Sequence, residues 1–319
     1  MIRPLKMCQV WKALCDVKTY RQFADNQSRI LFYNSSLRRA KPWLKLWDSY
    51  LTPLMTLRVR FSVTLPLFPN VYTIGPLNAL VKTKIGDDII SQCLSSSSNL
   101  LEPNNNCLTW LDSKPLRTVV YVSFGSIARL TCGQMLEFWF GLVNSGASFL
   151  WVIRHNMIEG VTRDDMIPIE LEEATKERGF VVDWAPQEDV LAHSAVGGFF
   201  THSGWNSILE SIDAGVPMIC WPLFGDHQLN SRWVSEGWKI GLDMKDTCDR
   251  LTIEIMIKTL MKHRREKIIR SMDRFSKLAH DSISPGGSSY NLEKLIEDLR
   301  STWFYDYTGN CKLTVAIYD

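Results

Sequence analysis

From residue 108 onward, short apolar runs alternate with longer segments of helical periodicity. The runs are rich in β-branched and aromatic residues, which is typical of buried strands. We expect strands at 118–124, 149–153, 180–184, 196–200, 217–220 and 241–244. We expect helices at 134–144, 169–178, 187–192, 206–214, 227–237, 251–281 and 290–300. This alternation predicts an α/β fold with a doubly wound, mostly parallel sheet.

The first third of the chain lacks this regularity. Aromatic residues are scattered over residues 1–70 without a sustained period, and we place no packed element there. Residues 78–106 include the runs Ser95–Ser98 and Asn104–Asn106, a composition typical of a loop. The charged run 262–267 indicates a solvated helix face.

The turn between strand 196–200 and the helix after it concentrates polar groups. A strand that enters a helix through small residues leaves free backbone N–H groups and the positive end of the helix dipole at one point, which favours a phosphate. An imidazole, an amide, a hydroxyl and a carboxylate surround that point: His202, Asn206, Ser207 and Glu210. Together these groups suit a nucleotide that carries a phosphate and a polar sugar.

The parallel topology extends this prediction to neighbouring strands. Ligands of open α/β sheets bind beyond the carboxyl ends of the strands. Ser126, Trp184 and His202 each follow an expected strand, so they should converge on one edge of the sheet.

Several residues of this region also have a purely structural interpretation. Ser207–Glu210 fits the S-x-x-E pattern of a helix capping box. Trp184 could be a core tryptophan, His202 a satisfied core histidine, and His227 the first residue of a helix. Spacing alone does not choose between these interpretations and a binding role.

Composition and charge exclude several classes of protein. The 319 residues are 45% apolar with a formal net charge of +2, which gives no case for nucleic-acid binding. No run approaches the roughly 20 apolar residues of a membrane span. The eight cysteines form no C-x-x-C pair, which argues against zinc. No G-x-G-x-x-G, P-loop or G-x-S-x-G motif marks an NAD enzyme, an NTPase or a serine hydrolase. We expect a cytoplasmic monomer.

Residues 184–226 resemble the signature box of plant family-1 UDP-glycosyltransferases of secondary metabolism. The matching positions are Trp184, Ala185, Pro186, Gln187, His193, Gly198, Phe199, Thr201, His202, Gly204, Trp205, Asn206, Ser207, Glu210, Gly215, Pro217, Trp221, Pro222 and Asp226. Segments 230–232 and 245–250 are similar to the branch that glucosylates iridoid acids of the 7-deoxyloganetic type. The resemblance implies a GT-B-type fold and inverting transfer of a hexose to a small hydroxyl or carboxyl acceptor, such as an iridoid, terpenoid or phenolic.

The resemblance also implies roles for individual residues. Trp184 would stack on uracil, the Ala185 backbone would read the base edge, and Gln187 and Glu210 would bind the ribose. The diphosphate would be bound by Ser126, His202, Asn206 and Ser207. The hexose would face Trp205, Asp226 and His227. The UDP-sugar is a co-substrate, and we expect no cofactor and no metal site.

One position departs from the family pattern. The box commonly ends in Gln, where this chain has His227, followed by Gln228. Within the resemblance a terminal Gln is associated with glucose and a terminal His with galactose. We therefore favour UDP-glucose as the donor and keep UDP-galactose as an alternative.

The family pattern also predicts how the chain divides. We expect an N-terminal acceptor-domain remnant at 1–77, a linker at 78–107, the nucleotide-sugar domain at 108–285, and a C-terminal helix and tail at 286–319. The family's catalytic base is an N-terminal His oriented by an Asp, but none of the six histidines precedes His155. We therefore expect a truncated chain that binds UDP-sugar weakly and transfers poorly. The alternative is a non-catalytic UDP-sugar-binding module.

Overall fold

The computed structural model describes residues 74–76, 79–80, 104–159, 176, 178–245, 247–263, 265–284 and 286–305, with only the backbone for 299–305. The chain divides into two compact units, Met1–Thr73 and Ile74–Asp319, and the described residues all belong to the second. The helix expected at 169–178 and the region before residue 74 lie outside the described residues, apart from positions 176 and 178.

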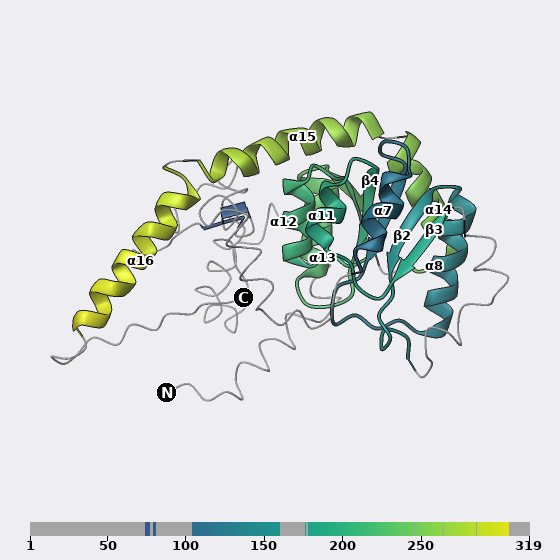
Figure 1. The fold of residues 1–319 in the computed structure, drawn as a ribbon, viewed down its shortest axis with the longest axis horizontal. Coiled ribbons are helices and arrows are strands. Elements are labelled where there is room, and N and C mark those ends of the chain that lie inside the picture. Colours follow the sequence, from purple (N-terminus) through teal and green to yellow (C-terminus); the bar gives the residue numbers. More distant parts are fainter. Residues whose placement is uncertain are drawn as a thin grey trace, which may run out of the picture. The chain divides into compact units, whose positions relative to one another are not determined.

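Six parallel strands form the sheet at the centre of this unit (Figure 1). They are β1 (Val119–Ser123), β2 (Ser148–Val152), β3 (Gly179–Val182), β4 (Val196–Thr201), β5 (Met218–Cys220) and β6 (Gly241–Asp243). Their spatial order is β3-β2-β1-β4-β5-β6, so the direction of winding reverses between β1 and β4. The predicted doubly wound sheet is confirmed, and its switch point lies between those two strands.

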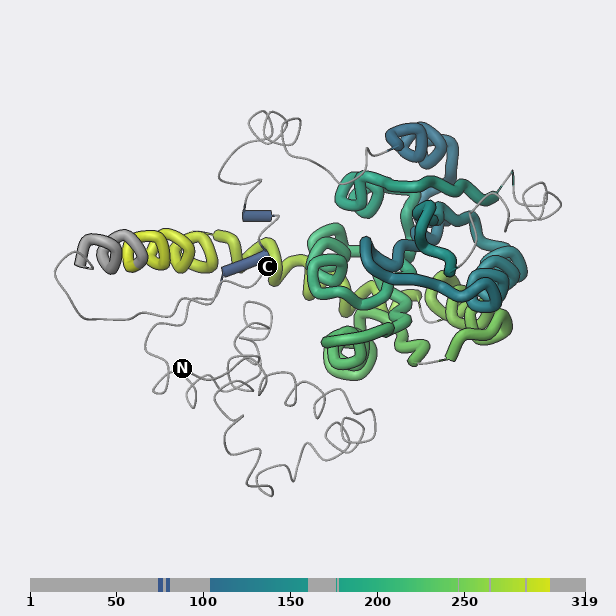
Figure 2. The backbone as a smooth tube through the Cα atoms, turned by 90° about the horizontal axis from the view of Figure 1, so that it is seen from below, coloured from purple at the N-terminus to yellow at the C-terminus, as the bar shows by residue number. Residues whose placement is uncertain are grey.

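Helices lie on both sides of the sheet (Figure 2). The described helices are α7 (Asn106–Asp112), α8 (Cys132–Ser145), α11 (Gln187–Ala192), α12 (Trp205–Asp213), α13 (His227–Arg232), α14 (Arg250–Lys258), α15 (Arg265–Ser282) and α16 (Ser288–Tyr305). Helix α14 packs on α8, whereas α11 packs on both α7 and α12. Two π-helical turns, η3 (Trp233–Gly237) and η4 (Thr259–His263), follow α13 and α14.

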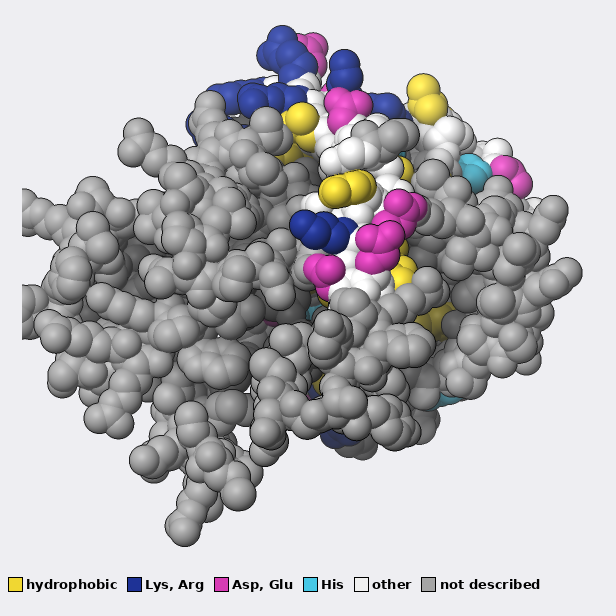
Figure 3. Space-filling view, turned by 90° about the vertical axis from the view of Figure 1, so that its left-hand side faces the viewer, with side chains coloured by type: hydrophobic (Ala, Val, Ile, Leu, Met, Phe, Trp, Pro, Cys, Tyr) yellow, Lys and Arg dark blue, Asp and Glu magenta, His cyan; other side chains and the backbone are white. Residues whose placement is uncertain are grey.

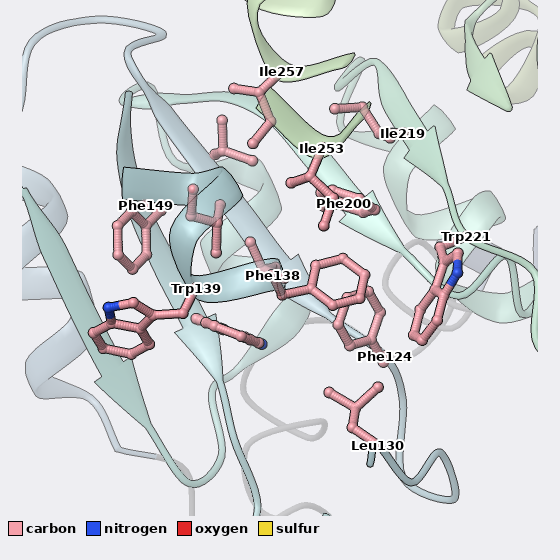
Figure 4. Close-up of a cluster of buried hydrophobic side chains, with 14 of the residues drawn as sticks. Phe124, Leu130, Phe138, Trp139, Phe149, Phe200, Ile219, Trp221, Ile253 and Ile257 are labelled. Carbon is pink, nitrogen blue, oxygen red and sulfur yellow. The ribbon is translucent and has the colours of Figure 1, made fainter. Parts of the chain in front are cut away.

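Alternate strand residues supply two apolar layers, because successive side chains of a strand point to opposite faces. On one face Val120, Val122 and Phe200 join the aromatic rings of α8 and the isoleucines of α14 in a buried cluster (Figure 4). On the other face Tyr121 stacks on Phe199 with ring centroids 5.1 Å apart. Both faces are covered, which explains why every residue of β1 and β4 is buried.

Three sequence predictions differ from the structure. A loop was expected through residue 106, but α7 begins at Asn106, whose N–H donates to the Asn104 side chain at 3.0 Å. The expected helices 227–237 and 251–281 each contain a π-helical turn. In η3 the Trp238 N–H donates to the Trp233 carbonyl, the i+5 spacing of a π turn.

Charged side chains stand at the surface of the described part. Lys262, His263, Glu266 and Lys267 are exposed, as the solvated-face interpretation predicts. Figure 3 shows basic and acidic side chains of the described part close together on one face. Within the described residues, every helix is too short or too polar to span a bilayer. In the same residues the His, Cys, Asp and Glu side chains form no group of three or more that could hold a metal ion.

Candidate functional site

The loops that follow β1 and β4 meet at the switch point, around the imidazole of His202. Gly125 has a φ of +76°, and a Cβ at this position would lie 2.6 Å from His202 Nε2. A Cβ at Gly204 would lie 2.5 Å from the same nitrogen. The imidazole therefore packs directly against the backbone at Gly125 and Gly204, where any larger residue would clash with it. This contact holds the ring at the point where the two loops converge.

Helix α12 begins at this point without a side-chain cap. Its N-cap is Gly204, and no side chain of the described residues accepts a hydrogen bond at that end. The capping-box interpretation of Ser207 and Glu210 is therefore wrong, because both residues lie inside the helix, past its first residue Trp205. The first N–H groups of α12 point, with the positive end of the helix dipole, toward the edge of the sheet.

The Glu210 carboxylate belongs to a polar network between α11 and α12. The side-chain amide of Gln187 donates to Glu210 Oε2 at 2.6 Å and to the Ser207 hydroxyl at 3.1 Å. The Tyr121 hydroxyl donates to Gln187 Oε1 at 3.3 Å. Burial raises the pKa of Tyr121, so its hydroxyl keeps the proton that it donates. The network orients the amide and the carboxylate together, as binding of neighbouring hydroxyls requires.

Two histidines share the centre of the site. The rings of His202 and His227 make an edge-to-face contact with centroids 4.8 Å apart. Burial and the neighbouring His227 lower the pKa of His202 to about 4, and burial also lowers the pKa of His227. Both rings are therefore neutral at pH 7. The Phe224 N–H donates to His227 Nδ1 at 3.4 Å, so the proton of the neutral His227 ring is on Nε2.

The β5 loop is tied to the β4 loop by one buried amide. Asn230 Nδ2 donates to the Ser203 carbonyl at 3.0 Å and to Asp226 Oδ2 at 2.8 Å. Ser203 has a φ of +68°, an unusual conformation for a residue other than glycine. Asn230 therefore connects a strained turn beside His202 to Asp226, the carboxylate that the family resemblance places next to the hexose.

The remaining predicted residues lie at the same edge, because β1, β3 and β4 are parallel and each residue follows the carboxyl end of a strand or begins the next helix. Ser126 and Asn206 are exposed, Trp184 and Trp205 are partly buried, and Ala185 is buried. Among the described residues, no hydrogen bond or ring contact joins the Trp184 side chain to the group around His202. The Trp205 ring instead lies 6.3 Å from that of Trp238.

Sequence reasoning missed Tyr121, Arg154 and Asn230. A tyrosine in the middle of an apolar strand was a usable signal, because a buried phenol needs a hydrogen-bond partner. The other two follow strand β2 and the signature box, and nothing in their local pattern distinguishes them from surface residues.

Comparison with known proteins identifies this arrangement. The model of the UDP-glucoronosyl and UDP-glucosyl transferase family matches residues 52–284. The chain belongs to this family. The described sheet is thus the Rossmann-like domain of a GT-B-type fold.

Individual relatives agree with this assignment. The 7-deoxyloganetic acid glucosyltransferase of Catharanthus roseus is 54% identical over 234 residues, which are 73% of this chain and 48% of that protein. Os79 of O. sativa, solved in complex with UDP, is 30% identical with a TM-score of 0.63 and covers 76% of this chain. UGT2 of Phytolacca americana, solved with UDP-2fluoro-glucose and pterostilbene, is 32% identical with a TM-score of 0.60 and also covers 76% of this chain. Those alignments span 52% and 51% of the two solved chains. This UDP-glycosyltransferase chain spans about half the length of the relatives it matches.

Proposed function

We propose that this domain binds a UDP-hexose at the carboxyl edge of its sheet and contributes to inverting transfer of the hexose to a small-molecule hydroxyl or carboxyl group. The observation that carries the proposal is the network in which Gln187 links Ser207 and Glu210, next to the uncapped start of α12. Names of relatives, including the 7-deoxyloganetic acid and myricetin 3-O-rhamnoside glucosyltransferases, support an iridoid, terpenoid or phenolic acceptor.

The nucleoside would be recognised at the α11 side of the site. Trp184 would stack on the uracil, and the backbone of the buried Ala185 would hydrogen-bond its edge. Gln187 and Glu210 would bind the ribose, with the Glu210 carboxylate accepting from two neighbouring hydroxyls. Because Tyr121 already holds Gln187 Oε1, the amide is oriented before the ligand arrives.

The diphosphate would bind at the start of α12. The helix N–H groups would donate to its oxygens, joined by the side chains of Ser126, His202, Asn206 and Ser207. Since burial keeps His202 neutral at pH 7, its ring contributes a hydrogen bond and not a positive charge. These donors would stabilise the negative charge that grows on UDP as it leaves. The proposal includes no metal and no cofactor.

The hexose would lie toward Trp205, Asp226 and His227. Because His227 Nδ1 accepts from the Phe224 N–H, the ring presents a single Nε2–H donor. A glutamine would instead present one acceptor and two donors. We favour glucose as the donor hexose, and this difference makes His227 the residue through which galactose would be selected.

Calorimetric titration of UDP, UDP-glucose and UDP-galactose tests the proposal, with product analysis on the same sample. We expect binding of UDP, and a loss of roughly 10- to 100-fold in UDP affinity for Glu210→Gln, because a charged acceptor to the ribose is removed. The matched control is Glu137→Gln, which removes a carboxylate bonded to Arg250 on α14. No binding of UDP by the folded protein would overturn the proposal, and binding without product would support the non-catalytic alternative.

Competition between the two UDP-hexoses tests the role of His227. We expect His227→Gln to raise the preference for glucose over galactose. An unchanged ratio would show that His227 does not select the sugar, while UDP binding in the same experiment would leave the nucleotide site intact.

A further inference from the structure

Arg154 is a buried cation at the carboxyl edge that the proposed function does not use. It follows β2, and only 6% of its surface is exposed. Its Nε donates to the Gly125 carbonyl at 3.2 Å and its Nη2 to the Ala128 carbonyl at 2.6 Å. Its Nη1 donates to Asn156 Oδ1 at 3.0 Å. The guanidinium thus spans the loop that carries Ser126, and all of these acceptors are neutral.

No carboxylate among the described residues pairs with this guanidinium. Asp183, at the end of the adjacent strand β3, lies 3.6 Å from the exposed His155. Burial, together with the nearby Arg129, lowers the pKa of Arg154. An unpaired charge inside a protein is unfavourable unless an anion compensates it, so such a charge next to a binding site points to an anionic ligand.

The position of Arg154 relative to the site indicates which ligand group compensates it. The Gly125 carbonyl that it binds belongs to the residue whose Cα faces His202 Nε2. The Arg154 charge also contributes, after burial and His227, to the lowered pKa of His202. The guanidinium therefore lies close to His202 and holds the turn that carries Ser126.

The two neutral histidines supply no positive charge to balance a bound diphosphate. A diphosphate is a multiply charged anion, yet His202 and His227 carry no charge at pH 7. The helix dipole supplies only about half a unit of positive charge. The positive charge of Arg154 is fixed, because guanidinium stays protonated at all working pH values.

We propose that Arg154 is a positioning residue for the diphosphate: it holds the Gly125–Ala128 loop through two carbonyls and supplies, through space, the positive charge that attracts the phosphates. The inference rests on the proposed function and extends it. Arg154, which lies outside the signature box, would make the site prefer a nucleoside diphosphate to an uncharged nucleoside.

The test compares UDP with uridine in three variants. Arg154→Met keeps an extended side chain and removes the charge. Arg154→Lys keeps the charge but cannot donate to both the Gly125 and Ala128 carbonyls as the planar guanidinium does. The matched control is Arg265→Met. Arg265 is also desolvated, and its Nη1 donates to the Gly197 carbonyl, which lies in β4 near its amino end and away from the site. All three proteins are titrated with UDP by calorimetry and with uridine by ligand-observed NMR, at low and high salt.

For Arg154→Met we expect UDP affinity to fall by roughly 10- to 100-fold and uridine affinity to stay within about twofold. Arg154→Lys should retain most of the UDP affinity, and Arg265→Met should match the unmodified protein. The salt dependence of UDP binding should weaken only in Arg154→Met. If Arg154→Met does not fold, Arg154→Gln removes the charge in its place, and the same loss of UDP affinity at unchanged uridine affinity is expected.

Equal losses for UDP and uridine, or an unchanged UDP affinity, would overturn the inference and leave the proposed function standing. Failure of the unmodified protein to bind UDP would instead refute the proposed function itself.

Discussion

Helices α8 and α12 begin in opposite ways, although each follows a strand of the central pair β1 and β4 (Figure 1). In α8 the Thr131 hydroxyl accepts from the Gln134 N–H at 3.2 Å, and Gln134 Oε1 accepts from the Thr131 N–H at 3.0 Å. This is a complete capping box. In α12 the N-cap is Gly204, which has no side chain to offer.

On the proposed function, this difference separates a helix start that contributes to stability from one that contributes to ligand binding. At the start of α8 the N–H groups of Thr131 and Gln134 both donate to side chains of the protein itself. In the proposed function the N–H groups at the start of α12 bind the diphosphate, and the glycine N-cap costs only roughly a few tenths of a kcal/mol relative to Ser or Thr. A partly buried imidazole, that of His202, occupies the space that a capping side chain would otherwise fill.

Acid should reveal this difference most strongly, because only the start of α12 carries an ionisable ring. The pKa of His202 falls from 6.5 to about 4 on folding, so between these values the unfolded chain binds more protons than the folded one. The free energy of unfolding should therefore fall as the pH drops from 7 to 4, by about 3 kcal/mol from His202. Denaturant unfolding at a series of pH values measures this change in the free energy of unfolding.

The control for the acid effect is His202→Gln, in which this part of the pH dependence should disappear. The lowered pKa of His227 acts in the same direction, so some dependence will remain. Thr131 and Gln134 do not ionise, and a Thr131→Ala variant should keep the full slope. An identical slope in His202→Gln would mean that this ring is not desolvated.

Gly204→Ala should separate binding from stability. The backbone at this position, with φ −61° and ψ 141°, accepts alanine, but the new Cβ would lie 2.5 Å from His202 Nε2 and displace the ring. We expect UDP affinity to fall by about 30-fold, or roughly 2 kcal/mol, with a melting temperature changed by only a few degrees. Calorimetry measures the UDP affinity of this variant, and thermal unfolding of the same sample measures its melting temperature. Unchanged UDP binding would show that the ring position does not matter.

The sequence predicted the sheet and most of its helices because their signals are local. The run TVVYVSF at 118–124 contains β1, and helix 187–192 agrees with α11 at both ends. Tightly bounded apolar runs and breaker residues fix such elements without knowledge of the rest of the fold. The π-helical turns η3 and η4 were missed because they continue the helical pattern without a break.

Cap assignments failed for a different physical reason. Ser207–Glu210 has the capping-box spacing but lies inside α12, while Thr131–Gln134, the true capping box, was not recognised. Both segments fit the same pattern, a hydroxyl residue followed three positions later by Glu or Gln, so only the position at which the helix begins decides which one caps. Contacts such as that of Arg154 with the Gly125 carbonyl join distant segments and have no local signal. The signature box supplied most of the candidate site residues, but not the residues that contact them, such as Tyr121 and Asn230.

Thr131→Ala tests the stabilising helix start. The substitution leaves the Gln134 N–H without its partner, and we expect a loss of about 1 kcal/mol in the free energy of unfolding. Thr131→Ser keeps the hydroxyl and should restore most of it. UDP affinity should stay the same in both variants, since α8 does not begin at the proposed site. A clear loss of UDP binding would contradict the separation of roles between α8 and α12.

Gly133→Ala is the smallest expected effect and the matched counterpart of Gly204→Ala. Gly133 lies in the first turn of α8, and a Cβ there would meet only Thr131 Oγ1, at 4.0 Å. Alanine should stabilise the protein by about 0.5–1 kcal/mol, because glycine in a helix loses more conformational freedom on folding. Chemical denaturation should show this gain and calorimetry an unaltered UDP affinity. A loss of stability would mean that a Cβ at Gly133 meets more than the Thr131 hydroxyl.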